Sequence, residues 1–235
     1  MKILGVDFES TGLDVQKDRI TEAGLVLYDT TARQPVRISG FLVKPMGAVI
    51  PSEVEQLTGI TNALVAEFGV MPTAMLAAIA QMESQADYLC AHNAEFDRGL
   101  YEAECARQKR EPSKKPWIDT RTDLPPAAYL LGKSASLKYL ACDHGFVYPA
   151  HRAVNDVLAM FEILSRYDIN ETVKRAQTPN VNVRAVVSFD DKHLAKERGY
   201  YWKPELKLWI KPLKADEVDA EKLAAPFPVV LMETK

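Results

Sequence analysis

Apolar and polar residues in the first 45 positions follow the period of β-strands. Within residues 20–29, Leu25 and Leu27 share one face, as expected where a strand covers a core on one side. Residues 2–9 and 36–45 have the same strand-like character, and turn-forming residues separate the three segments. The pattern therefore predicts three strands, antiparallel to one another, at the start of the chain.

Beyond residue 50 the pattern changes to helices with short apolar strands between them. The clearest helix covers residues 152–167, where apolar residues at 154, 158, 161 and 164 form one stripe. Helices and strands that alternate after an antiparallel start predict an α/β fold, a mixed sheet covered by helices. Further helices are predicted at residues 51–60, 71–83, 94–108 and 134–146, and short strands at 86–93 and 116–120.

The character of the sequence changes after residue 168. Residues 169–180 are mostly polar and predict a linker. Residues 181–214 predict a strand, a short helix and a hairpin, which would make a small basic, aromatic-rich α+β module. This module has a net charge of +4, whereas residues 215–235, which predict an acidic tail, have −3. Because the charge changes where the organisation does, we expect a first domain over residues 1–168 and a separate module.

The composition is that of an ordinary globular protein and excludes few functions. The 235 residues have a formal net charge of −3, so nucleic-acid binding would require a local basic patch. The three cysteines are widely spaced and predict neither a disulfide framework nor a zinc site. No apolar run reaches the length of a signal peptide or of a membrane span. We therefore expect a cytoplasmic protein without a membrane partner.

The first strand ends in two carboxylates separated by one residue, Asp7 and Glu9. Side chains two residues apart in a strand point to the same face. Two such anions about 4 Å apart repel by roughly 4 kcal/mol at an effective dielectric constant of about 20. A fold tolerates the pair where a proton is shared, a basic group intervenes or a metal ion binds. Taken alone, the pair fits equally well a polar turn before Gly12.

Three further titratable residues stand near the ends of predicted elements. Asp97 follows a strand, and Asp156 lies one turn into the helix over residues 152–167. Both also fit ordinary first-turn acids, which the helix dipole stabilises. His151 precedes this helix and equally fits a surface or capping histidine, with His144 as a rival candidate base.

In combination, these residues match the motifs of a known family. Residues 7–12 match D-x-E-[ST]-T-G, residues 92–97 match H-N-x-x-F-D, and residues 151–156 match H-x(4)-D. The chain therefore resembles the DEDD exonuclease superfamily, in the histidine-type branch that includes the proofreading exonuclease subunits of bacterial DNA polymerase. The resemblance covers residues 1 to 168 and implies a ribonuclease-H-like mixed five-stranded sheet flanked by helices.

The resemblance also implies a role for each catalytic residue. Two Mg²⁺ or Mn²⁺ ions would serve the attacking and leaving oxygens of a phosphodiester. Asp7 would bridge both ions, and Glu9 and Asp156 would complete the ligands of one. Asp97 would hold the second ion through water. His151 would accept the proton of the attacking water, a task that suits an imidazole.

The same resemblance points to substrate contacts around the motifs. The backbone from Phe8 to Gly12 would meet the 3′ nucleotide, and Leu13 or Phe96 would pack on bases. Phe8 departs from the family pattern, in which Thr is common, and its side chain is expected to point away from Asp7. The predicted substrate-binding residues are Phe8, Thr11, Gly12, Leu13, Asn93 and Phe96.

These expectations define a leading function and two alternatives. The leading prediction is a metal-dependent 3′→5′ exonuclease that releases nucleoside 5′-monophosphates from single-stranded DNA by a two-metal-ion mechanism with a histidine base. One alternative is a 3′→5′ exoribonuclease or oligoribonuclease, and the other is a non-catalytic subunit of a polymerase or repair complex. The expected partner is a nucleic acid with a free 3′ end, DNA favoured over RNA, with a DNA polymerase or repair complex as a candidate protein partner.

The hairpin of the small module leaves three roles open. Its aromatic residues alternate with lysines and could stack on bases and contact the phosphates of a single strand. They could also dock a protein, or simply build a small core. In the last case Trp202 and Trp209 would face each other across the hairpin.

Overall fold

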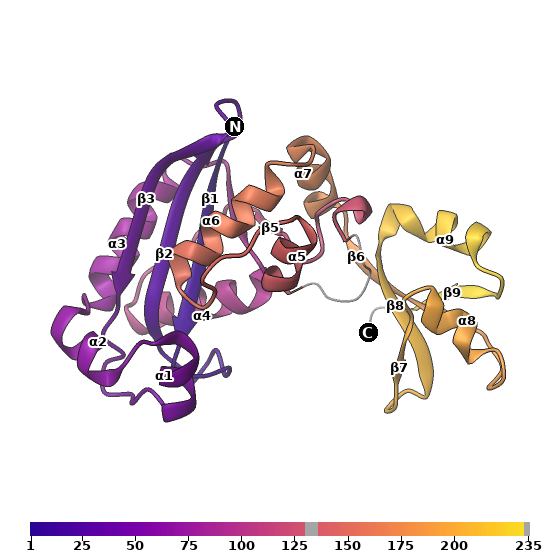
Figure 1. Ribbon diagram of the computed structural model, residues 1–235, viewed down its shortest axis with the longest axis horizontal. Coiled ribbons are helices and arrows are strands. Elements are labelled where there is room, and N and C mark those ends of the chain that lie inside the picture. The colour runs from indigo at the N-terminus through magenta and orange to yellow at the C-terminus, as the bar shows by residue number, and fades with distance from the viewer. Residues whose placement is uncertain (130–135, 233–235) are drawn as a thin grey trace. The chain divides into compact units, whose positions relative to one another are not determined.

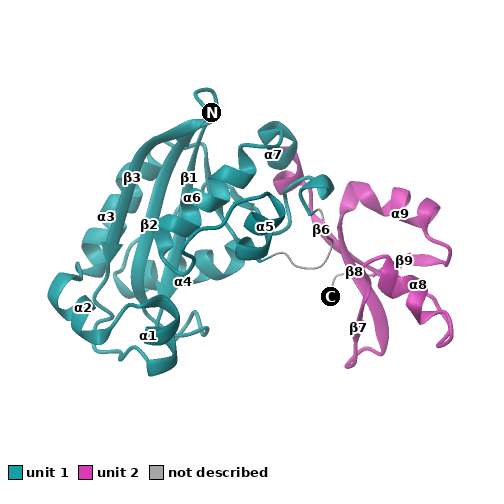
Figure 2. Cartoon of the chain, viewed as in Figure 1, with its two compact units in different colours: residues 1–173 teal, residues 174–235 magenta. Residues whose placement is uncertain are grey.

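The computed structural model describes residues 1–129 and 136–232. The chain divides into two compact units, residues 1–173 and residues 174–235 (Figure 2). No helix in the described part of the chain is both long enough and apolar enough to span a membrane.

The first unit contains a mixed five-stranded sheet with the order β3-β2-β1-β4-β5 (Figure 1). The first three strands pair antiparallel, and β4 and β5 continue the sheet parallel to β1. This arrangement confirms the predicted fold class. The strands are β1 Lys2–Ser10, β2 Ile20–Asp29, β3 Gln34–Leu42, β4 Tyr88–Ala91 and β5 Trp117–Asp119.

Helices cover both faces of this sheet (Figure 1). On one face, α3 and α4 bury the largest apolar cluster of the unit. On the other face, α6 packs against β1, β2 and β3. The helices are α1 Ser52–Thr58, α2 Asn62–Phe68, α3 Pro72–Glu83, α4 Ala94–Arg107, the 3₁₀ turn η1 Pro126–Ala128, α5 Leu137–Asp143, α6 Ala153–Leu164 and α7 Ile169–Gln177.

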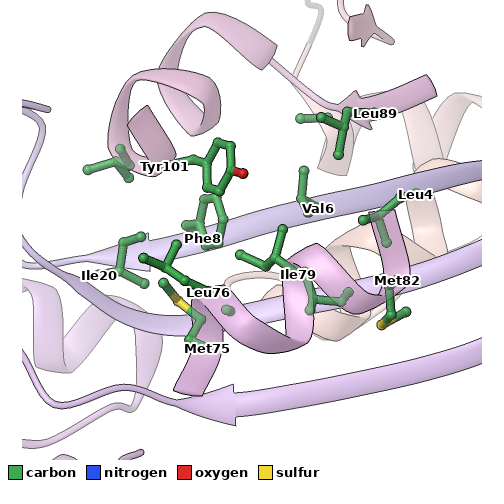
Figure 3. Packing of buried hydrophobic residues seen from close by; sticks show 14 of the residues in the cluster. Leu4, Val6, Phe8, Ile20, Met75, Leu76, Ile79, Met82, Leu89 and Tyr101 are labelled. Carbon is green, nitrogen blue, oxygen red and sulfur yellow. The ribbon is translucent and has the colours of Figure 1, made fainter. Parts of the chain in front are cut away.

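Alternation along β1 gives the two faces of the sheet different chemistry. Leu4, Val6 and Phe8 are buried against α3 and α4 (Figure 3). Gly5 points to the opposite face, where an added Cβ would lie 2.4 Å from the ring of Phe161 in α6. The side chains of residues 7 and 9 follow the same alternation as Gly5, so β1 directs them to the α6 face.

The second unit is a four-stranded sheet with the order β7-β8-β6-β9, in which all neighbours are antiparallel. Its core joins residues of the sheet to residues of α8 and α9, among them Val183, Ala195, Val218 and Val229. The elements are β6 Asn180–Ala185, α8 Lys192–Glu197, β7 Tyr201–Lys203, β8 Leu208–Lys214, the 3₁₀ turn η2 Ala215–Glu217, α9 Val218–Ala224 and β9 Val229–Leu231.

The structure differs from the predicted linker and tail. Residues 169–177 form α7, whose buried residue Thr172 shares one face with Ile169 and Val173. Two strongly apolar residues in a mostly polar segment are a weak signal, which is why the segment was predicted as a linker. Residues 215–232 form η2, α9 and β9, and β9 pairs with β6. The predicted acidic tail is therefore part of the second fold, because Val218 and Val229 complete its core. Residues 233–235 of that tail lie outside the described residues.

Candidate active site

Asp7 and Glu9 lie side by side on β1, on the face that α6 covers. Helix α6 approaches the sheet closely because β2 has a glycine beneath its first residue. A Cβ at Gly24 would lie 2.3 Å from the carbonyl carbon of Ala153, so any larger residue would push the start of α6 away from the sheet. Asp156 occupies the first turn of α6, and this close approach brings its carboxylate to β1.

Three of the predicted carboxylates converge. One oxygen from each of Asp7, Glu9 and Asp156 lies within 4.8 Å of the other two. This set, which we call the carboxylate cluster, is partly buried. Oxygen atoms of three carboxylates at this separation match the donors that Mg²⁺ and Mn²⁺ prefer.

Asp97 adjoins the carboxylate cluster and has one oxygen already engaged. It is 3% exposed in the first turn of α4 and accepts a 3.0 Å hydrogen bond from the backbone N–H of Phe8. Its negative charge raises the pKa of Asp7, the residue next to Phe8. Asp97 is therefore close enough to influence the cluster without being one of its three convergent carboxylates.

Burial and mutual repulsion raise the pKa values throughout the cluster. Burial raises the pKa of Asp7 well above its usual range, and the charges of Asp97, Asp156 and Glu9 raise it further. Burial, Asp156 and Glu22 raise the pKa of Glu9 to about 7. Burial also raises the pKa of Asp156. A bound cation would relieve this repulsion, so the donor set fits a metal site.

The raised pKa of Glu9 predicts how the metal-free protein responds to pH. In the unfolded chain this carboxyl titrates near 4.5, and in the folded chain near 7, so its stabilising contribution is complete below pH 4.5 and is lost as the pH rises to 7. Without divalent cations, Glu9→Gln should therefore be more stable than wild type at pH 8, by at most about 3 kcal/mol. The difference should vanish towards pH 4.5. Thermal and urea unfolding in EDTA measure it.

A matched substitution controls for the loss of one carboxylate. Glu111 is exposed and lies outside the cluster, so Glu111→Gln should show no such pH-dependent gain. Equal pH dependence of wild type and Glu9→Gln would contradict the burial and repulsion inferred for Glu9.

His151 precedes α6 and is exposed. Its backbone is left-handed, with φ of 66°, a conformation that is uncommon for a residue with a side chain and that is concentrated at functional sites. Its charge lowers the pKa of the Asp156 carboxyl, whereas burial raises this pKa. The rival candidate His144 has both ring nitrogens engaged, by the carbonyl of Leu140 and the hydroxyl of Tyr167.

The predicted substrate contacts divide into occupied and accessible groups. Phe8 has its side chain in the core and its N–H bonded to Asp97, as expected for a side chain that points away from Asp7. Thr11 bonds Asp18 through its hydroxyl, and Gly12 lies against the same carboxylate. Leu13 is 87% exposed.

The two remaining predicted contacts come from the second motif. Asn93 precedes α4 in a left-handed conformation with φ of 77°. Its N–H is bonded to Asp119 at 2.9 Å, and its side-chain oxygen accepts from Arg121. Phe96 is partly buried against the core of the unit. Of the six predicted contacts, Leu13 therefore has the most accessible side chain, and Phe8 has both its ring and its N–H occupied.

The structure adds two groups that the sequence analysis missed. Glu22 lies opposite Glu9 in the β1–β2 ladder and is 5% exposed. It accepts hydrogen bonds from the guanidinium of Arg152, the shortest 2.8 Å, and from the N–H of Ala153. Tyr148 donates a 2.8 Å hydrogen bond to Asp156. A single buried acid among the apolar residues of β2 was the available signal for Glu22, whereas nothing in the pattern marked Tyr148.

The Glu22–Arg152 pair predicts a non-additive effect on stability. Arg152→Ala leaves the buried Glu22 carboxylate without its counter-charge beside Glu9, which should cost about 1–3 kcal/mol. Replacing Glu22 by Gln in the same protein removes that uncompensated charge, so the double variant should regain part of the loss. Urea unfolding of both single variants and the double variant measures the coupling. Strictly additive effects would contradict the pairing.

Comparison with known proteins agrees with this geometry. A family model described as an exonuclease (RNase_T) matches residues 4–164, more than half of the chain. DNA polymerase III subunit epsilon of Treponema pallidum (strain Nichols) is 28% identical over 185 residues, which cover 74% of this chain and 83% of that protein. Residues 181–232 match a domain family of unknown function, DUF8626.

Solved structures share the fold at low sequence identity. The nuclease domain of 3′hExo, a DEDDh family member bound to rAMP, has a TM-score of 0.57 at 20% identity, with 70% of this chain and 90% of that one covered. The zinc-bound form of an E. coli ExoI–ssDNA complex has a TM-score of 0.63 at 18% identity, with 83% and 49% covered. These similarities confirm the predicted sheet and its flanking helices.

Proposed function

We propose, from the premise that this chain belongs to the exonuclease family, that it is a metal-dependent enzyme that removes nucleotides from the 3′ end of single-stranded DNA as nucleoside 5′-monophosphates. The family and the fold confirm the prediction of a DEDD-type 3′→5′ exonuclease. The metal ions, the histidine base, the substrate and the products are the proposal.

The carboxylate cluster is the observation that carries this proposal. Asp7, Glu9 and Asp156 bring three oxygens within 4.8 Å of one another in a partly buried site, an arrangement that is unfavourable unless protons or cations neutralise it. These three residues would hold Mg²⁺ or Mn²⁺, and Asp97 would take part through its charge beside Asp7. Bound ions would lower the pKa of a water and stabilise charge on the leaving oxygen.

The chain's own residues position the groups that react. Tyr148 holds Asp156 by its 2.8 Å hydrogen bond, and the backbone N–H of Arg152 donates to the other oxygen of this carboxylate at 3.0 Å. His151 adjoins Arg152 and is open to solvent, so a ring nitrogen can accept a proton from water and release it to the solvent. The exposed side chain of Leu13 is available to pack against a terminal base.

Two similar proteins that are part of a DNA polymerase or bind DNA favour DNA over RNA as the proposed substrate. The relative with 28% identity is a subunit of a DNA polymerase, and one structural neighbour is a complex with single-stranded DNA. Another neighbour holds rAMP, which keeps the exoribonuclease as the second candidate. The same relative supports a DNA polymerase as a candidate protein partner.

A purely structural role in a complex fits the cluster poorly. Three convergent carboxylates, with burial raising each of their pKa values, destabilise a protein that has no use for them. We therefore favour an enzyme over a non-catalytic subunit as the function of this chain.

Two single strands of the same sequence, one DNA and one RNA, test the proposed substrate. Each carries a 5′ label and competes with the other in one reaction with Mg²⁺, and chromatography against nucleotide standards identifies the released product. We expect faster shortening of the DNA and release of 5′-monophosphates. Faster shortening of the RNA would support the second candidate, and release of 3′-monophosphates would contradict the proposed cleavage site.

A further inference from the structure

The hairpin of the second unit exposes aromatic and basic side chains together. Tyr201 is 50% exposed and Trp202 is 46% exposed on β7. Lys203, which ends β7, and Lys207, in the turn before β8, are both exposed. The exposed half of each ring adds no burial to the stability of the unit, and exposed apolar surface beside basic side chains is available to a binding partner.

The register of the sheet shows which of these residues the core requires. Trp209 packs against the apolar cluster of the second unit, and Trp202 lies directly across from it, with ring centroids 5.8 Å apart. The predicted pair across the hairpin is therefore present. Tyr201 pairs with Ile210, and Ile210 pairs with Arg184, so these three side chains share the sheet face opposite to Trp209. The core thus accounts for Trp209 and, through their contact, for Trp202, but not for Tyr201, which lies on the other face.

The charges of the hairpin are largely unpaired. Within the described residues, none of Lys203, Lys207 and Arg184 has a carboxylate within ion-pair distance. The acids of α9 are instead used elsewhere, since Glu221 pairs with Arg198 and Lys211. Free cations beside exposed aromatic rings offer both an attraction for phosphates and stacking platforms for bases.

A second aromatic and cationic pair lies in the same unit. Phe189 is 78% exposed, and the ammonium of Lys192 lies 3.5 Å from the centroid of its ring. This contact holds a positive charge over an accessible aromatic face. It repeats, at another position of the unit, the combination found on the hairpin.

We propose that the hairpin surface, formed by Tyr201, Lys203 and Arg184 on one face of the sheet and by Lys207 in the turn, binds single-stranded DNA. The Tyr201 ring stacks on a base, and the three cations contact phosphates. The choice of DNA rests on the proposed function, but the site requires neither a 3′ end nor a metal ion. It would thus hold a strand independently of the carboxylate cluster.

A circular single strand separates this binding from catalysis, because it has no 3′ end. The full-length protein is titrated against an internally labelled DNA circle in EDTA, and fluorescence anisotropy gives the affinity. We expect salt-sensitive binding. Tyr201→Ala should weaken it by about 5- to 150-fold, as for the loss of one base stack. The pair Lys203→Gln and Lys207→Gln should lower the salt dependence, as the slope of log K against log [salt], by about 1.4.

Two matched controls and one rescue variant keep the test specific. Phe68→Ala removes an aromatic ring that is 63% exposed on α2 of the first unit, and Lys109→Gln removes an exposed cation there. Both should leave circle binding unchanged. Tyr201→Phe retains a stacking ring and should restore most of the affinity lost in Tyr201→Ala, which separates stacking from a defect in folding.

The outcomes also separate this proposal from the proposed function. Absence of circle binding, or equal binding by wild type and the three hairpin variants, overturns the proposal and leaves the 3′-end reaction untouched. Displacement of the circle by polyglutamate, with no effect of Tyr201→Ala, overturns it in favour of an acidic protein partner. Tighter binding of an RNA circle overturns the choice of DNA. Binding as expected, without cleavage of linear strands in Mg²⁺, overturns the proposed function alone.

Discussion

Asp7→Asn should abolish exonuclease activity while leaving the protein at least as stable as wild type. The substitution keeps the shape of the side chain and removes the charge that Asp97, Asp156 and Glu9 all oppose. Relief of this repulsion favours the folded state. Loss of a proposed metal ligand should remove several kcal/mol of transition-state stabilisation, which corresponds to a fall in kcat of about a thousandfold or more. Single-turnover rates in Mg²⁺ and thermal unfolding in EDTA measure the two effects.

A loss of activity without a loss of stability distinguishes a residue that serves catalysis from one that the fold requires. Asp216 is exposed in the second unit, so Asp216→Asn serves as the matched control and should change neither quantity. A fall in both activity and stability of Asp7→Asn would indicate that Asp7 serves the fold, and would contradict its place in the site.

His151→Ala should lower kcat by about 10²- to 10⁴-fold, the usual contribution of general base catalysis. Because the side chain is exposed, its removal should leave the melting temperature nearly unchanged. Added imidazole should restore part of the rate, since a small base can enter the space that the side chain leaves. Rates with and without imidazole, at saturating Mg²⁺, measure the effect.

The histidine of the second unit provides the control for this variant. His193 is also exposed, and His193→Ala should neither lose rate nor respond to imidazole. A His151→Ala variant as fast as wild type would remove this residue from the mechanism, and His144 could not replace it because both of its ring nitrogens are engaged.

The sheet and the placement of the first two acids could be predicted because they follow from local periodicity. The period of two along β1 places Asp7 and Glu9 on one face, and the structure agrees. The motifs also named Asp156, and it joins the cluster as predicted. Asp97 lies beside the cluster, and its role as a water-mediated ligand stays a prediction.

The supporting groups of the site could not be predicted, because they depend on contacts between distant elements. The bond between Tyr148 and Asp156 requires the loop before α6 to fold back on that helix. The pairing of Glu22 with Arg152 joins β2 to the start of α6, 130 residues along the chain. The close approach of α6 to the sheet at Gly24, and also at Gly5 and Gly40, brings these elements together, and a pattern of apolar residues does not reveal it.

Residues 215–232 were predicted as a tail, and not as part of the second unit, for a related reason. Residues 215–232 carry many acids, which suggested a solvated tail, although Val218, Phe227 and Val229 are buried in the core of that unit. Val218 lies in a short helix, Val229 in a three-residue strand and Phe227 between the two, and three apolar residues placed in this way are too few to establish a period. Pairing of β9 with β6 is a long-range contact that the local sequence does not encode.

The most direct test of the central claim is a time course on single-stranded DNA labelled at its 5′ end. Wild type and Asp7→Asn are compared with Mg²⁺ and with EDTA. The carboxylate cluster predicts a ladder of progressively shorter labelled strands, formed by wild type with Mg²⁺ and absent from the other three reactions. Early release of the label as a mononucleotide, or equal ladders from wild type and Asp7→Asn, would contradict a metal-dependent 3′→5′ exonuclease that acts at this cluster.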